Sequence, residues 1–499
     1  MGKIQKIKKY FLYSMEDLIE VYELLVSFSV RSYNEGNISN SLKCIEAAAL
    51  LQYNLNYYYS DSHLNEILRQ ISLLFEKKEK INVNNNTICF IDSFARDNHG
   101  LTQQYLDALF KNQFKLIYIS EIRDIGSKIF KLLEDNHAKI FKVDNLSILE
   151  EVKRIIEILK IEAPSSVYYH LSPNSIGPII AGYYVSEMHN VQINLTDHGF
   201  WLGGADLFNS MLEFRTFGLR LSREKRNFSE NQLVLMPFYP WTENIPFEGF
   251  PIDTTGKVVM FSGGAMYKTE GGGGKFFSIL KQIMDEYPEV VFFYAGDGNK
   301  THFETFISDN EYHDRMFLLG QRDDINEVFK HSDIYYSTYP LFGGLMSQYA
   351  AINGIPILAY GNEEIESVVC TKKPAHFTFN SEESLIEEAG KLIENPDYRR
   401  ERSDFFKGLC IDQEEFRARM RRWMETSVKP ELSYETKPID YASFCKENVE
   451  RINNGCQGLG IELMLLRRCP KAMTWKMWMN VLMNIPEVIR VQKRRKTIN

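Results

Sequence analysis

The sequence predicts an α/β protein with two doubly wound parallel sheets and a smaller helical module before them. Three observations lead to this prediction. Short apolar segments alternate with helical stretches over residues 83–245, and the same alternation restarts after a proline-rich connector and runs over residues 246–430. Residues 15–78 show helical periodicity alone. The remaining residues, 431–499, are expected to form helices that end in a basic tail.

The first 82 residues are predicted to form a helical module. Apolar residues recur at helical spacing over 18–25 and again over 42–49, and the turn at residues 34–37 separates the two stretches. A helix pair with an alanine-rich second helix is similar to one tetratricopeptide unit, although no second copy follows at that period. The polar run 77–86 marks the first domain boundary.

The next segment, residues 83–245, is predicted to form the first parallel sheet. Helical stretches separate its strand-like runs, as in βαβ units, whose strands pair in parallel. The predicted strands are residues 87–93, 116–119, 138–143, 166–170 and 191–195.

A second sheet is predicted after the connector at residues 237–251. Two doubly wound sheets in one chain predict a ligand cleft between them. The strands expected in this sheet are residues 257–262, 290–295, 316–319, 334–337 and 355–360.

Composition excludes several classes of protein. With 44% hydrophobic and 25% charged residues, the chain has the balance of a soluble globular protein. A net charge of −8 argues against a surface built for nucleic acid. The seven cysteines form no C-x-x-C pair, so neither a disulfide framework nor a zinc site is expected, and a reducing cytoplasm fits best. Acidic residues interrupt the N-terminal apolar stretch, which argues against a signal peptide or a membrane span.

Basic residues are concentrated at the C-terminus, where residues 460–499 carry nine Lys or Arg against two Glu. Two interpretations remain open. Residues 460–485 fit a helix packed on the N-terminal domain, whereas the tail 486–499 fits peripheral contact with the anionic inner face of a membrane.

A loop between the fourth and fifth strands of the second sheet has the features of a diphosphate site. Glycines allow the backbone to approach a ligand, and the following helix offers unpaired N–H groups and the positive end of its dipole. The alternative is an ordinary βαβ turn. The candidate donor contacts here are Gly343, Gly344, Leu345, Met346 and Ser347.

Residues 255–362 resemble the GT-B glycosyltransferases, which bind a nucleotide diphosphate sugar over such a loop. Within that superfamily, Phe-Ser-Gly-Gly-Ala-Met-Tyr-Lys at 261–268 is similar to a strand and loop of the O-GlcNAc transferase and bacterial adhesin N-glycosyltransferase group, whose lysine contacts the donor phosphates. The resemblance implies two Rossmann-like domains that face a cleft, with Lys268 on the phosphates and with Gly263 and Tyr267 beside it. The segments 295–298 and 319–324 agree with the superfamily.

A lysine at the phosphates has a physical reason. The leaving diphosphate gains negative charge as the sugar bond breaks, and the sequence shows no metal motif that would neutralise it. Lys275, which follows four glycines, is a competing candidate for Lys268.

The chain departs from the superfamily pattern at two places. Where retaining enzymes carry Glu-x7-Glu it has Leu341 and Tyr349, so we expect inversion at the anomeric carbon. Where the O-GlcNAc transferase group has His-Thr-Thr it has residues 344–346, and Ser347 and Gln348 could substitute as donor contacts. A uridine diphosphate sugar remains the first choice of donor.

The N-terminal sheet is expected to supply the acceptor side. His198 follows a strand end and has the pKa range of a general base, and Asp197 could orient it. A histidine that merely caps the turn is the alternative. His99 with Gly100, after the first strand, is another acceptor-side candidate, and His170 ends the fourth predicted strand.

One arginine is a further donor candidate. Arg215 lies in the segment 213–220, before the connector, and could reach the donor phosphates. Charged residues on a surface helix would give the same pattern.

Taken together, the sequence predicts a cytoplasmic, metal-independent, inverting glycosyltransferase of bacterial type with a protein or glycan acceptor. It needs no cofactor besides the nucleotide sugar. A UDP-sugar epimerase is one alternative, and a non-catalytic GT-B-like partner subunit of a glycosylation complex is another. The helical N-terminus could bind a partner protein, and no nucleic acid is expected.

Overall fold

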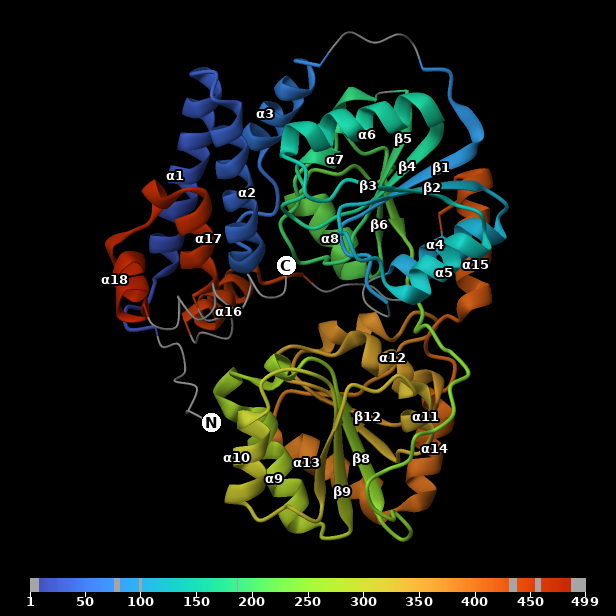
Figure 1. Ribbon diagram of the computed structural model, residues 1–499. Helices are drawn as coiled ribbons and strands as arrows, with labels where there is room; N and C mark the ends of the chain where they lie inside the picture. The colour runs from blue at the N-terminus through green and yellow to red at the C-terminus, as the bar shows by residue number, and fades with distance from the viewer. Residues whose placement is uncertain are drawn as a thin grey trace. The chain divides into compact units, whose positions relative to one another are not determined.

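The computed structural model describes residues 9–75, 81–97, 101–185, 187–429, 438–453 and 459–485 (Figure 1). The chain divides into two compact units. Unit 1 comprises Met1–Glu213, Gly218–Val234 and Pro438–Asn499, and unit 2 comprises Phe214–Phe217 and Leu235–Lys437. The helices near both ends of the chain therefore belong to the same unit as the first sheet.

The described residues of unit 1 form a seven-stranded sheet in the order β3-β2-β1-β4-β5-β6-β7, in which β1 to β6 pair in parallel. Its order reverses direction between β1 and β4, as in a doubly wound sheet. The five strands that the sequence predicts are β1 to β5, and β6 and β7 are additional. The strands are β1 (Asn84–Asp92), β2 (Lys115–Ser120), β3 (Lys139–Lys142), β4 (Pro164–His170), β5 (His189–Ile193), β6 (Ser210–Glu213) and β7 (Leu233–Leu235).

Helices cover the sheet of unit 1, and further helices from the N-terminal and C-terminal parts of the chain belong to the same unit. Alternate residues of each strand point to opposite faces, so that Cys89 and Ile91 join the large apolar core with α6 and α7, whereas Phe90 stacks on Tyr118 on the other face. The helices are α1 (Met15–Asn34), α2 (Ile38–Leu55), α3 (Ser62–Ser72), α4 (Thr102–Lys111), α5 (Ser127–Asp135), α6 (Ile148–Glu162), α7 (Gly177–Tyr184), α8 (Thr216–Lys225), α16 (Tyr441–Asn453), α17 (Gly460–Arg468), η4 (Pro470–Ala472) and α18 (Trp475–Met483).

The first and the last described segments of the chain pack together in unit 1. Leu465 of α17 and Met477 of α18 are buried in the same apolar core as α1 and α2, as expected for the packed-helix interpretation of residues 460–485. Tyr13 donates a hydrogen bond from its hydroxyl to Glu462 at 2.6 Å, and Lys9 lies 3.4 Å from the same carboxylate. Among the described residues, no helix combines the length and the apolar character needed to cross a bilayer.

Unit 2 contains the second sheet. In its described residues the sheet has six strands in the order β10-β9-β8-β11-β12-β13, all paired in parallel. The five predicted strands are β8 to β12, and the two-residue β13 is additional. The strands are β8 (Val258–Gly263), β9 (Val290–Ala295), β10 (Met316–Gly320), β11 (Ile334–Tyr336), β12 (Ile357–Tyr360) and β13 (Thr378–Phe379).

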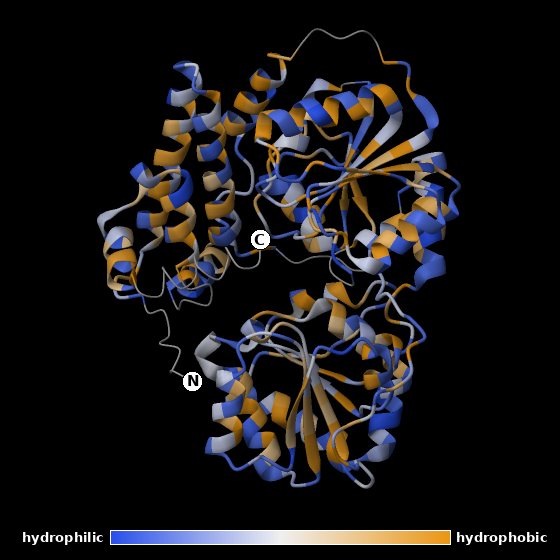
Figure 2. Cartoon of the chain, in the orientation of Figure 1, coloured by the Kyte–Doolittle hydropathy of each residue, from blue (hydrophilic) through white to orange (hydrophobic). Residues whose placement is uncertain are grey.

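Apolar layers lie on both faces of this second sheet. Met260 and Phe292 pack with α9 and α13 on one face, and Phe261 and Phe293 pack with α11, α12 and α14 on the other. Figure 2 shows the largely apolar strands and the mixed surfaces of the helices. The helices are η1 (Met266–Thr269), η2 (Gly272–Gly274), α9 (Lys275–Glu286), α10 (Thr301–Asp309), α11 (Ile325–Lys330), α12 (Gly344–Ile352), η3 (Glu363–Val368), α13 (Glu382–Glu394), α14 (Pro396–Phe406) and α15 (Gln413–Thr426).

Candidate donor site and acceptor-side residues

In unit 2, the loops that leave the carboxyl ends of β8 and β9 are joined through their backbones. The N–H of Gly264 donates to the carbonyl oxygen of Ala295, and the N–H of Met266 donates to that of Asp297, both at 2.9 Å. Gly296 has φ +156°, and a Cβ added there would lie 1.9 Å from the Gly264 carbonyl oxygen. Only glycine fits at this position, and its close approach holds the two loops together.

Helix α12 begins at this edge of the sheet with unpaired amides. Its first helical hydrogen bond runs from the N–H of Ser347 to the carbonyl oxygen of Gly343 at 2.9 Å. No described residue accepts a hydrogen bond from the N–H groups of Gly344, Leu345 or Met346, and no side chain caps the helix. The tip can therefore offer three donors and the positive end of the helix dipole to an anion.

Lys268 lies next to the loop that leads to this tip. Its carbonyl oxygen accepts a hydrogen bond from the N–H of Leu341 at 3.3 Å. The side chain is half-buried, and within the described part of the chain its ammonium forms no hydrogen bond and no ion pair. Burial lowers the pKa of the Lys268 ammonium from its ordinary value. An unpaired, partly desolvated cation of this kind would gain a strong charge-assisted contact from an anion.

Two other predicted donor residues lie in the same region. Gly263 ends β8, and a Cβ added there would lie 2.6 Å from Cε of Met346, so the first loop touches the start of α12. Tyr267, next to Lys268, is about half exposed. The structure thus brings the candidate residues of the two loops together around Lys268.

Lys275, the competing cation, is already paired. Its Nζ lies 2.6 Å from Oε1 of Glu382 and 5.0 Å from the ring centroid of Tyr360. The hydrogen bond from Lys275 to Glu382 raises the pKa of the Lys275 ammonium. A phosphate would have to compete with a carboxylate here, whereas no carboxylate among the described residues pairs with Lys268.

The side chains suggested as substitutes on α12 are engaged with backbone groups. The Ser347 hydroxyl donates to the carbonyl oxygen of Gly343 at 3.1 Å, and the Gln348 amide donates to that of Phe238 at 3.2 Å. The buried Tyr349 hydroxyl donates to a carbonyl oxygen of the connector. As they stand, these three side chains hold α12 in place and do not point to a ligand.

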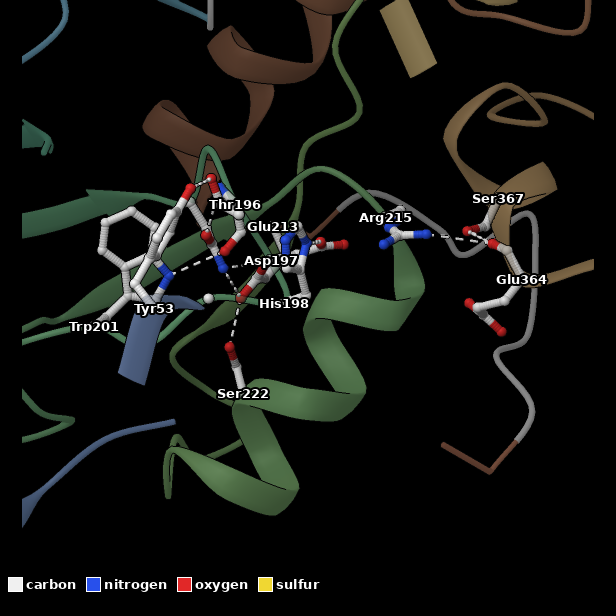
Figure 3. A network of polar contacts seen from close by, with 12 residues as sticks. Tyr53, Thr196, Asp197, His198, Trp201, Glu213, Arg215, Ser222, Glu364 and Ser367 are labelled. Carbon is white, nitrogen blue, oxygen red and sulfur yellow. Dashed lines mark hydrogen bonds and ion pairs between the residues drawn. The ribbon is translucent and has the colours of Figure 1, made fainter. Parts of the chain in front are cut away.

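Arg215 points toward Glu364 of η3 (Figure 3). Its Nη1 donates to the carbonyl oxygen of Glu364 at 3.4 Å, and its guanidinium lies 4.5 Å from the ring centroid of Phe217. Glu364 belongs to η3, and a Cβ added at Gly344 would lie 2.8 Å from Cγ1 of Val368 in the same 3-10 helix. Arg215 therefore contacts η3, and η3 in turn packs against the start of α12.

The segment 319–324, which agrees with the superfamily, has a structural role. Arg322 makes two hydrogen bonds to the carboxylate of Asp324, at 2.6 and 2.5 Å, and a third to the carbonyl oxygen of Gly249 at 2.9 Å. The N–H of Glu248 donates to the same carboxylate at 2.8 Å. This pair ties the connector to the sheet of unit 2.

In unit 1, His198 is close to Asp197. Nδ1 of His198 lies 3.4 Å from Oδ1 of Asp197, and the His198 side chain is 38% exposed while that of Asp197 is buried. The His198 ring packs edge-on against Phe444 of α16, with 5.7 Å between ring centroids. A partly exposed imidazole can accept a proton from a ligand, and the buried carboxylate beside it can orient the ring.

A buried charged network supports this segment (Figure 3). The Glu213 carboxylate accepts hydrogen bonds from Asn194 at 2.8 and 2.9 Å and from Ser222 at 2.5 Å, and it lies 3.6 Å from Arg226. Arg226 also donates to the carbonyl oxygen of Asp197 at 2.7 Å. Burial raises the pKa of Glu213 to about 7, against the opposing effect of the Arg226 charge. Arg226 therefore fixes the backbone that carries His198.

His170 belongs to a different, fully buried group. Its Nδ1 lies 3.0 Å from the Asp92 carboxylate, which also accepts hydrogen bonds from Tyr118 at 2.7 Å and Thr102 at 2.9 Å. Although burial acts in the opposite direction, the charge and hydrogen bond of His170 lower the pKa of Asp92. His170 thus has a structural environment. The predicted acceptor-side residues His99 and Gly100 lie outside the described residues.

Sequence reasoning missed a polar cluster at the carboxyl ends of β1, β2 and β4. Ser93 and Ser175 both donate to the Glu121 carboxylate, the latter at 2.6 Å. Burial and the neighbouring Glu121 raise the pKa of Glu151 on α6 to about 9. The strand ends were the available signal, because polar residues gather there in doubly wound sheets. Among the described residues no group of three or more His, Cys, Asp or Glu could hold a metal ion.

Of the comparisons with known proteins, only the one with solved structures finds matches. No family model matches the sequence, and no curated protein matches it significantly. Anabaena HepE, crystallised with UDP and glucose, matches with a TM-score of 0.53 and 12% identity over 68% of this chain and 100% of that chain. A glycosyltransferase from Rickettsia africae matches with a TM-score of 0.52 and 13% identity over 69% of this chain and 100% of that chain. An O-GlcNAc transferase mutant from Thermobaculum terrenum gives 0.49 and 12% identity over 90% of each chain.

The first two likenesses establish the fold. Two doubly wound parallel sheets flanked by helices, matched over the full length of both solved structures, define the GT-B fold that the sequence predicts. The third score is too low to add to this. At these identities the likeness concerns the fold, and the reaction has to be argued from the residues of the site.

Proposed function

We propose that this chain is a glycosyltransferase whose unit 2 binds a nucleotide diphosphate sugar. The observation that carries the proposal is the unpaired Lys268 ammonium, whose loop is hydrogen-bonded to the segment that leads to the uncapped start of α12. A cation and three free N–H groups on adjoining loops suit the two phosphates of such a donor. Arg215, on the element next to the same helix tip, is proposed as an additional phosphate contact.

The chemistry of the reaction explains why these groups would be useful. As the bond between the sugar and the diphosphate breaks, negative charge builds up on the leaving phosphate oxygens. Lys268 and the α12 amides are in place before the reaction, so they would stabilise this charge without reorganisation. We propose that the leaving group needs no metal ion for this reason.

UDP is the proposed nucleotide. The solved structure of HepE contains UDP and glucose, and that chain shares the fold along its whole length. The residues of this chain suit the diphosphate of a UDP-sugar, which is why UDP is the first nucleotide to test.

His198 is the proposed general base on the acceptor side. An exposed hydroxyl of a protein or glycan acceptor would lose its proton to the imidazole, and Asp197 would orient the ring and stabilise its charged form. Leu341 and Tyr349 occupy the places of the carboxylates of retaining enzymes, which supports inversion at the anomeric carbon.

The test of the donor site is calorimetric titration of the full chain with UDP. Lys268→Met should weaken UDP binding by about tenfold to a hundredfold, the value of one charge-assisted hydrogen bond. Lys275→Met is the matched control, because Lys275 already forms an ion pair with Glu382. This variant should bind UDP with the wild-type affinity. Equal weakening by both variants, or by neither, would contradict the assignment of Lys268.

The same titration separates the proposed enzyme from the non-catalytic alternative. Wild-type protein is expected to bind UDP more tightly than uridine, because the diphosphate makes the main contacts. If the wild-type chain binds none of UDP, GDP and CMP, a partner subunit that keeps the fold without the chemistry becomes the better explanation.

A further inference from the structure

Helix α18 carries an apolar stripe that is exposed. Trp475 and Leu482 are 62% and 53% exposed, and the exposed apolar residues of this helix follow the i, i+3, i+4, i+7 spacing of one helix face. On the opposite face, Met477 and Val481 are buried in the core of unit 1. The exposed residues of the stripe are Trp475, Trp478, Met479, Leu482 and Met483.

The N-terminal segment extends this stripe. The N–H groups of Tyr10 and Phe11 both donate to the Asn480 side chain at 3.0 Å, and the Phe11 ring packs edge-on against Trp475 at 5.1 Å. Tyr10 and Leu12 are 50% and 59% exposed. We call the combined surface the terminal patch, made up of the five stripe residues of α18 together with Tyr10 and Leu12.

Basic sequence continues directly from both sides of the terminal patch. Residues 1–8 contain three lysines and no acidic residue, and residues 486–499 contain five Lys or Arg and one Glu. Both segments lie outside the described residues, so only their composition is used. The chain as a whole has a net charge of −8, so these two basic segments differ in sign from the rest of the sequence.

We propose that the terminal patch binds the surface of an anionic lipid bilayer. Trp, Met and Leu side chains on one helix face would enter the interface between headgroups and acyl chains, where tryptophan is favoured. The adjoining lysines and arginines would be attracted to acidic headgroups. A nine-residue helix is too short to cross a bilayer, so α18 would lie on the membrane.

A second copy of the chain suits this surface less well. In both copies the sequence next to the patch residues is basic, so like charge would oppose a two-fold contact through the terminal patch. An anionic bilayer matches both the apolar side chains and the flanking charge.

The test is co-sedimentation of the full chain with vesicles of phosphatidylcholine alone and of phosphatidylcholine mixed with phosphatidylglycerol. Binding is expected to the mixed vesicles only, and added salt should weaken it. Trp475→Ser combined with Leu482→Ser should reduce the bound fraction by a factor of about ten or more, because two exposed apolar anchors are lost. Both positions are exposed, and circular dichroism would confirm the fold.

The control is Ile161→Ser, which removes a 77% exposed apolar side chain from α6 and should bind as wild type does. Equal binding to neutral and mixed vesicles, or unchanged binding of the double variant, would overturn the proposal. It would also be overturned if light scattering showed a dimer that the double variant converts to a monomer, since the patch would then be an interface between copies.

Discussion

His198→Asn is expected to lower sugar transfer by a factor of about 100 to 10,000, the usual contribution of a general base. Asparagine keeps a polar side chain of similar size but cannot accept the acceptor's proton. UDP binding should stay at the wild-type value, because the donor contacts lie in unit 2. The measurement is UDP release from a panel of UDP-sugars, with calorimetry of UDP on the same protein.

His63→Asn is the matched control for this prediction. His63 also lies near a carboxylate, 3.7 Å from Asp61, but it lies on α3 and its side chain is 78% exposed. Its replacement should leave transfer unchanged. If His198→Asn transfers sugar as fast as the control does, His198 is not the base, and another acceptor-side group has to be sought.

Arg226→Met is expected to destabilise unit 1 by about 3 to 5 kcal/mol at neutral pH, the usual cost of removing one partner of a buried ion pair. Arg226 is buried, lies 3.6 Å from Glu213 and donates to the carbonyl oxygen of Asp197. Methionine fills the volume but leaves the Glu213 carboxylate without its cation.

The loss should grow as the pH rises. The pKa of Glu213 is raised to about 7 in the folded protein, above the value of about 4.3 expected for an unfolded chain. Such a group favours folding below its unfolded pKa, and that contribution is lost as the pH rises through the folded pKa. Without Arg226 the folded pKa rises further, so the variant should keep losing stability above pH 7.

Urea unfolding of the wild type and the variant at acidic, neutral and alkaline pH measures this effect. Arg223→Met is the control on the neighbouring turn, because Arg223 forms an exposed ion pair with Glu230. Exposed pairs of this kind contribute little, so its transition should stay close to wild type. A pH-independent loss in Arg226→Met would show that the Glu213 charge is not what Arg226 balances.

Much of the fold follows from local sequence patterns. The predicted strand at residues 290–295 is β9, and the predicted strand at 87–93 overlaps β1, because buried parallel strands are continuous apolar runs. Strands β6 and β7 escaped prediction because they are too short to form such a run. They have four and three residues, and β6 ends in the charged Glu213, which is buried only because Asn194, Ser222 and Arg226 surround it.

The candidate site was less predictable, because its outcome depends on residues far apart in the chain. Lys268 and Lys275 are both candidates in the sequence, and the sequence does not reveal that Glu382, 107 positions after Lys275, pairs with it. Ser347 and Gln348 lie at the expected helix start, yet both side chains bond to backbone carbonyls. Helical periodicity cannot reveal such partners.

The most direct test of the donor site is hydrogen–deuterium exchange of the full chain with and without UDP. UDP is expected to slow exchange in peptides that cover residues 264–270 and 341–347, where the amides at the start of α12 would become hydrogen-bond donors to phosphate. Unchanged exchange in both segments at saturating UDP, or protection confined to other parts of the chain, would contradict it.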